Sequence, residues 1–165
     1  MSQNLNTQSL ILMTTVLLVG LSAGIMFTWN NAVTTGLNRL SDDGYLKAFQ
    51  QMNRTILNPT FYTVFMGPII LLIATIIVCR DQPGQIFYLL LAAAVLYIGG
   101  VILITIFGNI PLNEMLDKSD LNAMNTRELQ QLRSKFELKW NQFHAIRTYC
   151  SIISFGLLIF VLKLF

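Results

Sequence analysis

Four long runs of apolar residues constrain this 165-residue chain more than any other feature. They cover residues 10–33, 61–79, 86–107 and 149–165, and a bilayer-spanning helix needs about 20 mostly apolar residues. In hydrocarbon only helices or closed barrels satisfy the backbone, and continuous rather than alternating runs favour helices. The chain is therefore predicted to be all-α, a single integral membrane domain over residues 1–165 that forms an up-down four-helix bundle.

The composition excludes several classes of protein. Hydrophobic residues make up 54% of the chain and charged residues only 12%, whereas a soluble domain carries about 25% charged residues. This argues against a water-soluble enzyme, and the net charge of +3 argues against a nucleic-acid binder. One histidine and two cysteines are too few for a structural zinc site built from one chain, so no metal is expected. Cys79 and Cys150 fall at opposite ends of the predicted bundle, which predicts two free thiols.

The basic residues predict an orientation. Nine of the eleven lie in two long connections, residues 34–60 and 108–148. The positive-inside rule therefore places both connections in the cytoplasm and both termini outside. The expected location is the inner membrane of a bacterium.

The two long connections carry amphipathic helical patterns of their own. Ser41 with two following aspartates is a helix start, and apolar residues then recur at helical spacing as far as Ile56. Asn125 with Glu128 three residues later is a capping pair. One helix from Asn125 to the C-terminus would be about 60 Å long, so its first half should project from the membrane and pack against the helix that follows Ser41.

Polar side chains gather at the end of the predicted bundle where the two long connections lie, which we call the loop-side end. Trp140, His144 and Arg147 are spaced i, i+4 and i+7 and share one helix face. Polar groups near a membrane are costly unless they face the bundle interior and find partners. We therefore predict a pocket at the loop-side mouth of the bundle, lined by these three residues together with asparagines from the other segments.

Simpler interpretations exist for each of these residues. Arg147 is equally well explained as an interfacial anchor, and Trp140 is better explained as a member of the aromatic belt than as a catalytic residue. The asparagines are typical caps of helices and turns. A lone histidine such as His144 is more often structural than catalytic.

Four segments together resemble the anthrone-oxygenase-like family of small four-span membrane proteins. They are GLSAGIMF at 20–27, FQQMNRTILNP at 49–59, GNIPLN at 108–113 and WNQFHAIRT at 140–148. Their order and their positions between the spans also fit that family.

The resemblance implies an oxygenase that oxidises a flat, anthrone-like or other apolar substrate with molecular oxygen and without a cofactor. Such a reaction needs a base, a group that stabilises an oxyanion and an apolar slot for the ring. His144 is the candidate base, because imidazole titrates near neutral pH. The candidate substrate-binding residues supply an anion stabiliser, amides and ring-stacking partners; they are Trp140, Asn141, Arg147, Asn109, Asn53 and Phe49.

The main alternative is a non-enzymatic protein, either a membrane helper subunit or a lipid-phase small-molecule binder. Haem held by two histidines would need a dimer, because the chain has one histidine. The expected partners are an apolar small molecule or a lipid, together with the membrane itself and no nucleic acid. The sequence leaves the substrate and the oligomeric state open.

Overall fold

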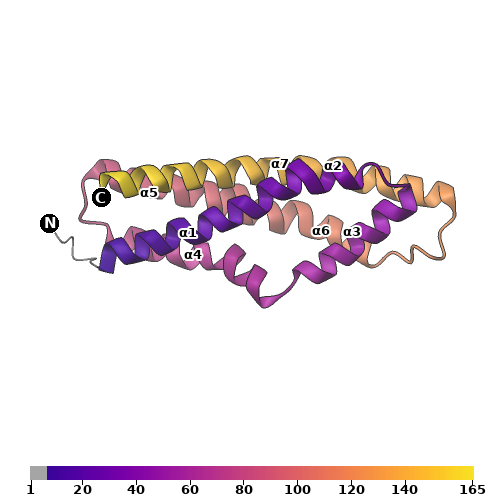
Figure 1. Cartoon of the computed structure of the whole chain (residues 1–165), viewed down its shortest axis with the longest axis horizontal. Helices are drawn as coiled ribbons and strands as arrows, with labels where there is room; N and C mark the ends of the chain where they lie inside the picture. The colour runs from indigo at the N-terminus through magenta and orange to yellow at the C-terminus, as the bar shows by residue number, and fades with distance from the viewer. Residues whose placement is uncertain (1–6) are drawn as a thin grey trace.

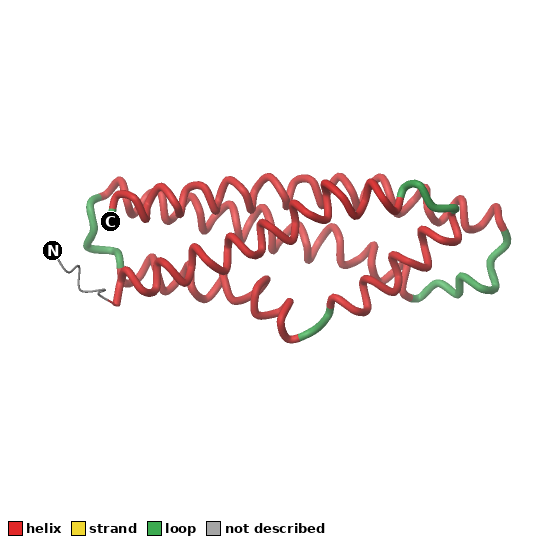
Figure 2. Tube along the Cα trace, in the orientation of Figure 1, coloured by secondary structure: helices red, strands yellow, loops and turns green. Residues whose placement is uncertain are grey.

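The computed structural model describes residues 7–165, and all regular structure in that range is helical (Figures 1 and 2). Four helical rods are long and apolar enough to cross a membrane, which confirms the predicted all-α fold. The first rod comprises α1 (Thr7–Thr28), a π-helix η1 (Trp29–Val33) and α2 (Thr34–Leu37). The second is α4 (Pro59–Val78). The third comprises α5 (Gly84–Tyr97), π-helices η2 (Ile98–Leu103) and η3 (Thr105–Asn109), and α6 (Ile110–Asp117). The fourth is α7 (Thr126–Leu164), and α3 (Asp42–Ile56) lies between the first two rods.

The four rods pack side by side in an up-down bundle, and the beginning of α1 and the C-terminus of the chain lie at the same end (Figure 1). Its core is a cluster of fully buried side chains from all four rods, among them Leu12, Leu72, Tyr97 and Leu158. Large apolar side chains also point outward, and Ile70 is 72% exposed. An apolar core inside an apolar outer surface is the pattern of a bundle surrounded by lipid.

Small hydroxyl groups join the rods within this core. The Thr15 and Thr75 hydroxyls lie 2.8 Å apart, and the Tyr97 hydroxyl donates to Ser22 Oγ over 2.8 Å. Ser154 Oγ donates to the Ala93 carbonyl oxygen over 2.8 Å. Such interhelical hydrogen bonds supplement van der Waals packing, because lipid gives helices no hydrophobic reason to associate.

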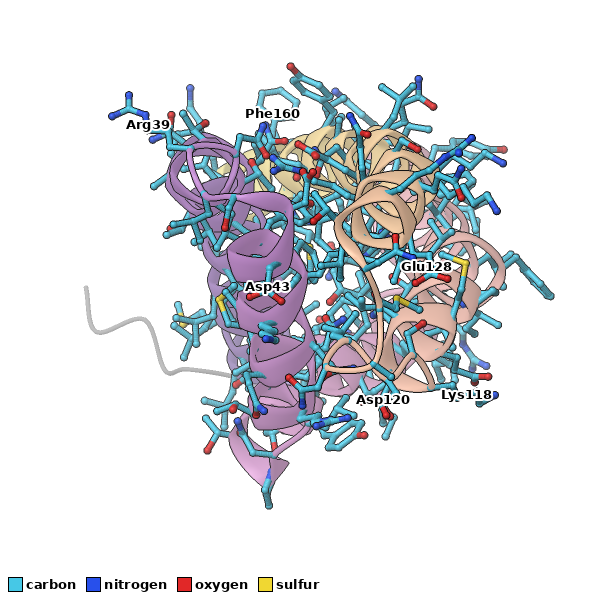
Figure 3. All side chains as sticks on the ribbon, turned by 90° about the vertical axis from the view of Figure 1, so that its right-hand side faces the viewer. Arg39, Asp43, Lys118, Asp120, Glu128 and Phe160 are labelled. Carbon is cyan, nitrogen blue, oxygen red and sulfur yellow. The ribbon has the colours of Figure 1, made fainter. Side chains whose placement is uncertain are left out.

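A second core lies beyond the bundle, where α3 packs against the first half of α7 (Figure 1). Helix α7 has 39 residues and begins at the predicted Asn125–Glu128 capping box, and Ser41 caps α3 as predicted. The cluster that fills this core contains Tyr45, Leu46, Phe49, Leu116, Leu121, Leu129, Leu132, Phe136 and Trp140. Its solvent-facing end carries charged residues such as Asp43 and Glu128 (Figure 3).

Arg133 ties α3 to α7 in this region. Its guanidinium donates to Asp42 Oδ1 over 3.0 Å and to Glu137 Oε2 over 2.6 Å. Its Cζ also lies 4.4 Å from the ring centroid of Tyr45. Burial, reinforced by the Glu137 carboxylate, raises the pKa of the Tyr45 phenol above its ordinary value. This phenol therefore stays protonated and acts as a packing group.

Two helices run past the points where the apolar runs end. The first rod continues to Leu37, and the third continues beyond residue 107 to Asp117 although Pro111 follows. In the third rod the helix continues through the π-helix η3, in which the Ile110 N–H donates to the Thr105 carbonyl oxygen five residues back. Pro111 then falls at the first turn of α6, where a missing N–H is tolerated.

Cys79 and Cys150 are both free thiols, as predicted. Cys79 caps the end of α4, whereas Cys150 lies in α7 against Gly100 of η2. A Cβ on Gly100 would overlap the Cys150 side chain, but a Cβ on neighbouring Gly99 would meet nothing within 4 Å. Gly100 thus sets how closely η2 and α7 approach.

This contrast gives a matched pair of variants. Gly100→Ala should lower the free energy of unfolding by about 1–3 kcal/mol, because the added methyl group forces the helices apart. Gly99→Ala should leave it unchanged or slightly raised, because alanine favours helix. Thermal unfolding in detergent, followed by circular dichroism, measures both. Equal losses in the two variants would show that the Gly100–Cys150 contact does not control the packing.

Candidate functional site

A cavity of about 400 Å³ lies at the loop-side end of the bundle, where the membrane core meets the second core. Its wall is formed by residues of α1, α3, α4, α6 and α7 and of the π-helices η1 and η3. Most of the wall is apolar or aromatic, including Ile25, Met26, Phe61, Phe65 and Met66. This volume is in the usual range for small-molecule sites.

His144 lies on the α7 wall of the cavity and both of its ring nitrogens are engaged. Nε2 lies 3.1 Å from the Met26 carbonyl oxygen, and Nδ1 lies 2.7 Å from Arg147 Nη2. Because a guanidinium can only donate, Nδ1 accepts this bond, and Nε2 therefore carries the proton that goes to Met26. The geometry thus assigns a neutral imidazole whose lone pair points at Arg147.

Arg147 is a buried cation, with only 6% of its surface exposed. Besides His144, it donates from Nη1 to Thr105 Oγ1 over 2.9 Å, and its Cζ lies 5.5 Å from the ring centroid of Trp140. None of the ion pairs among residues 7–165 involves Arg147. Its Nε is buried without a hydrogen-bond partner. A buried charge without a counter-charge is strongly unfavourable, which makes the site complementary to an anion.

Trp140 forms a rigid part of the wall. Its ring stacks on His144 with centroids 4.8 Å apart, and its Nε1 donates to Asn113 Oδ1 over 2.7 Å. Asn109 lies behind it and donates from Nδ2 to the Trp140 carbonyl oxygen over 3.2 Å. Asn109 and Asn113 thus hold Trp140 and hence the face that Trp140 presents to His144.

Trp29 packs directly against Trp140, with tilted rings whose centroids lie 6.0 Å apart. It opens η1, where the first rod changes from α- to π-helical turns, and such irregular turns are often found at functional sites. Its Nε1 and the Nδ2 of Asn53, on α3, are both buried without a hydrogen-bond partner. Both residues line the cavity.

The predicted site residues fall into two groups. Trp140, His144, Arg147 and Asn53 all line the cavity. The other three lie outside its lining: Phe49 is fully buried with its ring edge-on to Trp140, Asn109 lies behind Trp140, and Asn141 lies next to it on α7. Sequence reasoning missed Trp29, Met26 and Thr105 as parts of the site. Asn113 was among the asparagines expected near the pocket, but it was interpreted as a cap and not as a substrate-binding residue.

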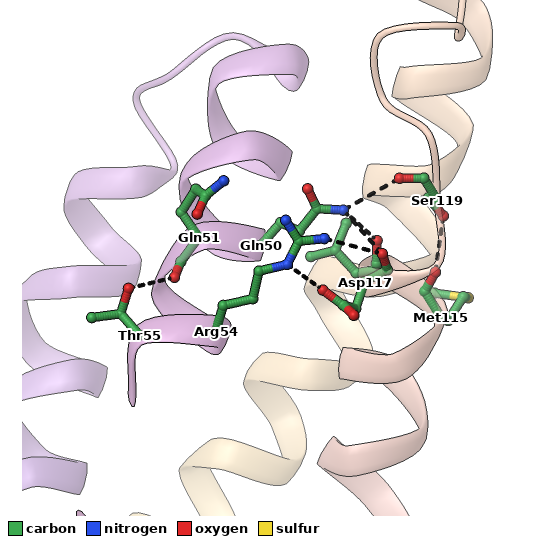
Figure 4. Close-up of polar contacts among 8 residues, drawn as sticks. Gln50, Gln51, Arg54, Thr55, Met115, Asp117 and Ser119 are labelled. Carbon is green, nitrogen blue, oxygen red and sulfur yellow. Dashed lines mark hydrogen bonds and ion pairs between the residues drawn. The ribbon is translucent and has the colours of Figure 1, made fainter. Parts of the chain in front are cut away.

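The aqueous side of the cavity is bordered by an ion pair between α3 and α6 (Figure 4). Arg54 Nε donates to Asp117 Oδ1 over 2.6 Å, and both side chains are about half exposed, at 50% and 51%. Gln50 Nε2 reinforces the junction by donating to the Leu116 and Ser119 carbonyl oxygens, over 2.9 and 3.2 Å. These bonds satisfy carbonyls at the end of α6 and hold α3 against it.

Comparison with known proteins assigns the family. The family model described as anthrone oxygenase matches residues 60–157, more than half of the chain. The chain belongs to the anthrone oxygenase family. The residues matched by the family model include Trp140, His144 and Arg147 but not Trp29 or Asn53. No curated protein and no solved structure matches the chain.

The site of this anthrone oxygenase family member combines three chemical properties. It offers a mostly apolar cavity with aromatic residues in its wall, a buried guanidinium that forms no ion pair, and a neutral histidine beside that guanidinium. Among residues 7–165, no three His, Cys, Asp or Glu side chains gather where they could hold a metal ion. The arrangement is suited to a flat apolar molecule that carries or develops negative charge on oxygen.

Two arginines on α7 allow a direct test of the unpaired charge. Arg147→Met should raise the free energy of unfolding of the unliganded protein by about 1–3 kcal/mol, because it removes a buried charge that has no carboxylate partner. Arg133→Met should lower it by a similar amount, because it leaves Asp42 and Glu137 without their cation. Thermal unfolding in detergent measures both variants. A loss of stability in Arg147→Met as large as that in Arg133→Met would mean that Arg147 is a structural residue.

Proposed function

We propose that this chain is a membrane oxygenase that oxidises a flat, anthrone-like substrate with molecular oxygen and without a cofactor. The observation that carries the proposal is the buried guanidinium of Arg147, which lines a mostly apolar cavity and, within residues 7–165, forms no ion pair with a carboxylate. A neutral ketone that becomes an enolate anion in the reaction supplies the missing charge only once its proton has left. Arg147 then stabilises the charged form more than the neutral substrate, which is how an enzyme lowers a barrier.

The proposed reaction balances with dioxygen as the only oxidant. The ring CH₂ opposite the ketone loses a proton, and the resulting enolate carbon gives its electrons to dioxygen as a C–O bond forms. Protonation of the peroxide anion gives a hydroperoxide. Loss of water then breaks the O–O bond and the remaining C–H bond, and leaves a new ketone. One CH₂ and one O₂ become one C=O and one H₂O.

His144 is the proposed base, and its geometry sets a condition on the mechanism. The Nδ1 lone pair accepts a hydrogen bond from Arg147 Nη2, so it becomes available only when that donor turns to the substrate oxygen. The bond from Nε2 to the Met26 carbonyl can persist and hold the ring in place during proton transfer. Binding of the substrate oxygen by Arg147 and release of the base are thus one movement.

Access from the lipid phase suits an apolar substrate. Leu57 and Tyr62 line the cavity and are 60% and 47% exposed, which supports an apolar rim where α3 meets α4. The aqueous side, in contrast, is bordered by the Arg54–Asp117 pair. A substrate dissolved in the membrane reaches the cavity without crossing that polar border.

A second candidate function is a lipid-phase small-molecule binder without catalysis. It is favoured by one observation, that both His144 nitrogens are occupied and no base is free in this arrangement. An assay of anthrone turnover distinguishes the two functions, because only the oxygenase converts the molecule that it binds.

The oxygenase proposal predicts the effect of removing the base. His144→Gln keeps a donor for the Met26 carbonyl but has no titratable nitrogen, so anthrone turnover should fall about 10²–10⁴-fold while the protein stays folded. Purified protein in detergent is assayed by absorbance, with Ile146→Ala, an exposed residue of the same helix, as the control. If His144→Gln turns over anthrone as fast as wild type, the assignment of His144 as the base is wrong. If wild type turns over no anthrone-like compound, the oxygenase proposal is wrong and the non-catalytic binder is favoured.

The proposed orientation has both long connections in the cytoplasm and both termini outside, in a bacterial inner membrane. In a variant with Cys79 and Cys150 replaced by serine, a cysteine at Asp81 should react with an impermeant maleimide added to intact cells. A cysteine at Asn122 should react only after the cells are opened. Both native positions are exposed, so a lack of access does not explain protection. The opposite pattern would invert the topology.

A further inference from the structure

A chain of four buried hydrogen bonds crosses the site from the first rod to the third. It begins at the Met26 carbonyl oxygen of α1, which lies 3.1 Å from His144 Nε2. It continues from His144 Nδ1 to Arg147 Nη2 over 2.7 Å, and from Arg147 Nη1 to Thr105 Oγ1 over 2.9 Å. It ends where Thr105 Oγ1 bonds to the Val101 carbonyl oxygen of η2 over 2.7 Å. Three side chains therefore connect main-chain acceptors on two different rods.

The chemistry of each group fixes the direction of these bonds. A carbonyl oxygen can only accept, so the single hydroxyl proton of Thr105 goes to Val101. The lone pairs of Thr105 Oγ1 are then left for Arg147. A guanidinium can only donate, so Arg147 donates at both of its terminal nitrogens, once to η3 and once to His144 on its own helix.

Thr105 is the partner that fixes how the guanidinium is rotated within its own plane. Arg147 Cζ lies 5.5 Å from the ring centroid of Trp140, and contact with a ring face restrains the tilt of the plane but not the direction of its N–H bonds. Bonds from two terminal nitrogens to acceptors on two elements do restrain that direction. Without the Thr105 oxygen, Nη1 would be a buried donor without an acceptor, which is unfavourable. The guanidinium would then turn toward the cavity that Arg147 lines.

We propose that Thr105 is a positioning residue, which aims Arg147 at His144 Nδ1 and keeps the imidazole lone pair engaged until a ligand arrives. The next step of this inference rests on the proposed function. When Nη2 turns from His144 to the substrate oxygen, Nη1 keeps its bond to Thr105, which is the pivot of that movement. Thr105 thus acts through Arg147 and needs no contact with the substrate itself.

A second buried threonine supplies a matched control. Thr148 is 2% exposed and Thr105 is 8% exposed, but the Thr148 hydroxyl donates to the His144 carbonyl oxygen over 2.9 Å and not to Arg147. Thr105→Val and Thr148→Val each replace a buried hydroxyl by a methyl group of similar size, yet only Thr105→Val removes an acceptor of Arg147. Thr105→Ser keeps the hydroxyl and should restore the contact.

The readout is the ¹⁵N NMR signal of His144 Nδ1 in untagged protein in detergent. The chain has one histidine, so ¹⁵N-labelled histidine reports on this ring alone. A hydrogen bond to an unprotonated ring nitrogen moves its signal toward that of a protonated nitrogen, and Arg147→Met gives the signal without this donor. Thr105→Val should move the Nδ1 signal most of the way to its position in Arg147→Met. Thr105→Ser and Thr148→Val should keep it near the wild-type position.

Three results would overturn the positioning role. They are an Nδ1 signal in Thr105→Val equal to that of wild type, an equally large displacement in Thr148→Val, or a signal in Thr105→Ser that matches Thr105→Val. If Thr105→Val does not fold, Thr105→Ala, which also lacks the hydroxyl, decides in its place.

An assay of anthrone turnover separates this inference from the proposed function. Thr105→Val should lower kcat about 10- to 100-fold with little change in KM, because a misdirected Arg147 stabilises the developing anion less, and Thr105→Ser should recover most of the rate. A displaced signal with an unchanged rate would overturn the role of Thr105 as the pivot. A displaced signal in a protein that turns over no anthrone-like compound means that the oxygenase proposal is wrong and the positioning role stands. Turnover by wild type with no displacement in Thr105→Val means the reverse.

Discussion

Helix α7 runs unbroken through two cores of different kinds, and the rest of the structure depends on this continuity. Its second half packs in the bundle with Leu12, Leu72 and Leu90, and its first half packs with α3 around Phe49 and Phe136. One rigid helix therefore fixes the position of the second core relative to the core of the membrane bundle. The cavity lies where the two cores meet, and the residues of α7 that line it come from the middle of the helix.

The bundle and the α7 side of the site could be predicted because both depend on local patterns. Apolar length predicts spans, and the i, i+4, i+7 spacing placed Trp140, His144 and Arg147 on one face, which lines the cavity. The capping signals at Ser41 and Asn125 were also readable, since a cap forms within four residues.

The other walls of the site could not be predicted, because they depend on how distant helices meet. Trp29 lies inside an apolar run and nothing in its local pattern marks it, and only the approach of α7 brings it against Trp140 beside the cavity. Phe49 was expected to stack on a ligand, but edge-on contacts with Trp140 and Phe136 bury it completely. The π-helical turns that carry the third rod past its apolar run were also not predicted, because an apolar run indicates the length of a span and not the type of its helical turns.

The two sides of the cavity differ in how they respond to dissolved ions. The Arg54–Asp117 pair is half exposed, so its attraction is screened as ionic strength rises, and such pairs contribute little to stability in any case. The rim formed by Leu57 and Tyr62 carries no charge and is indifferent to salt. The hydration of the cavity is therefore linked to the composition of the aqueous phase, whereas the proposed entry of an apolar substrate past this rim is not. Under the proposed function, the exposure of a peroxide near Arg147 to water would depend on one weak surface contact between two other helices, α3 and α6.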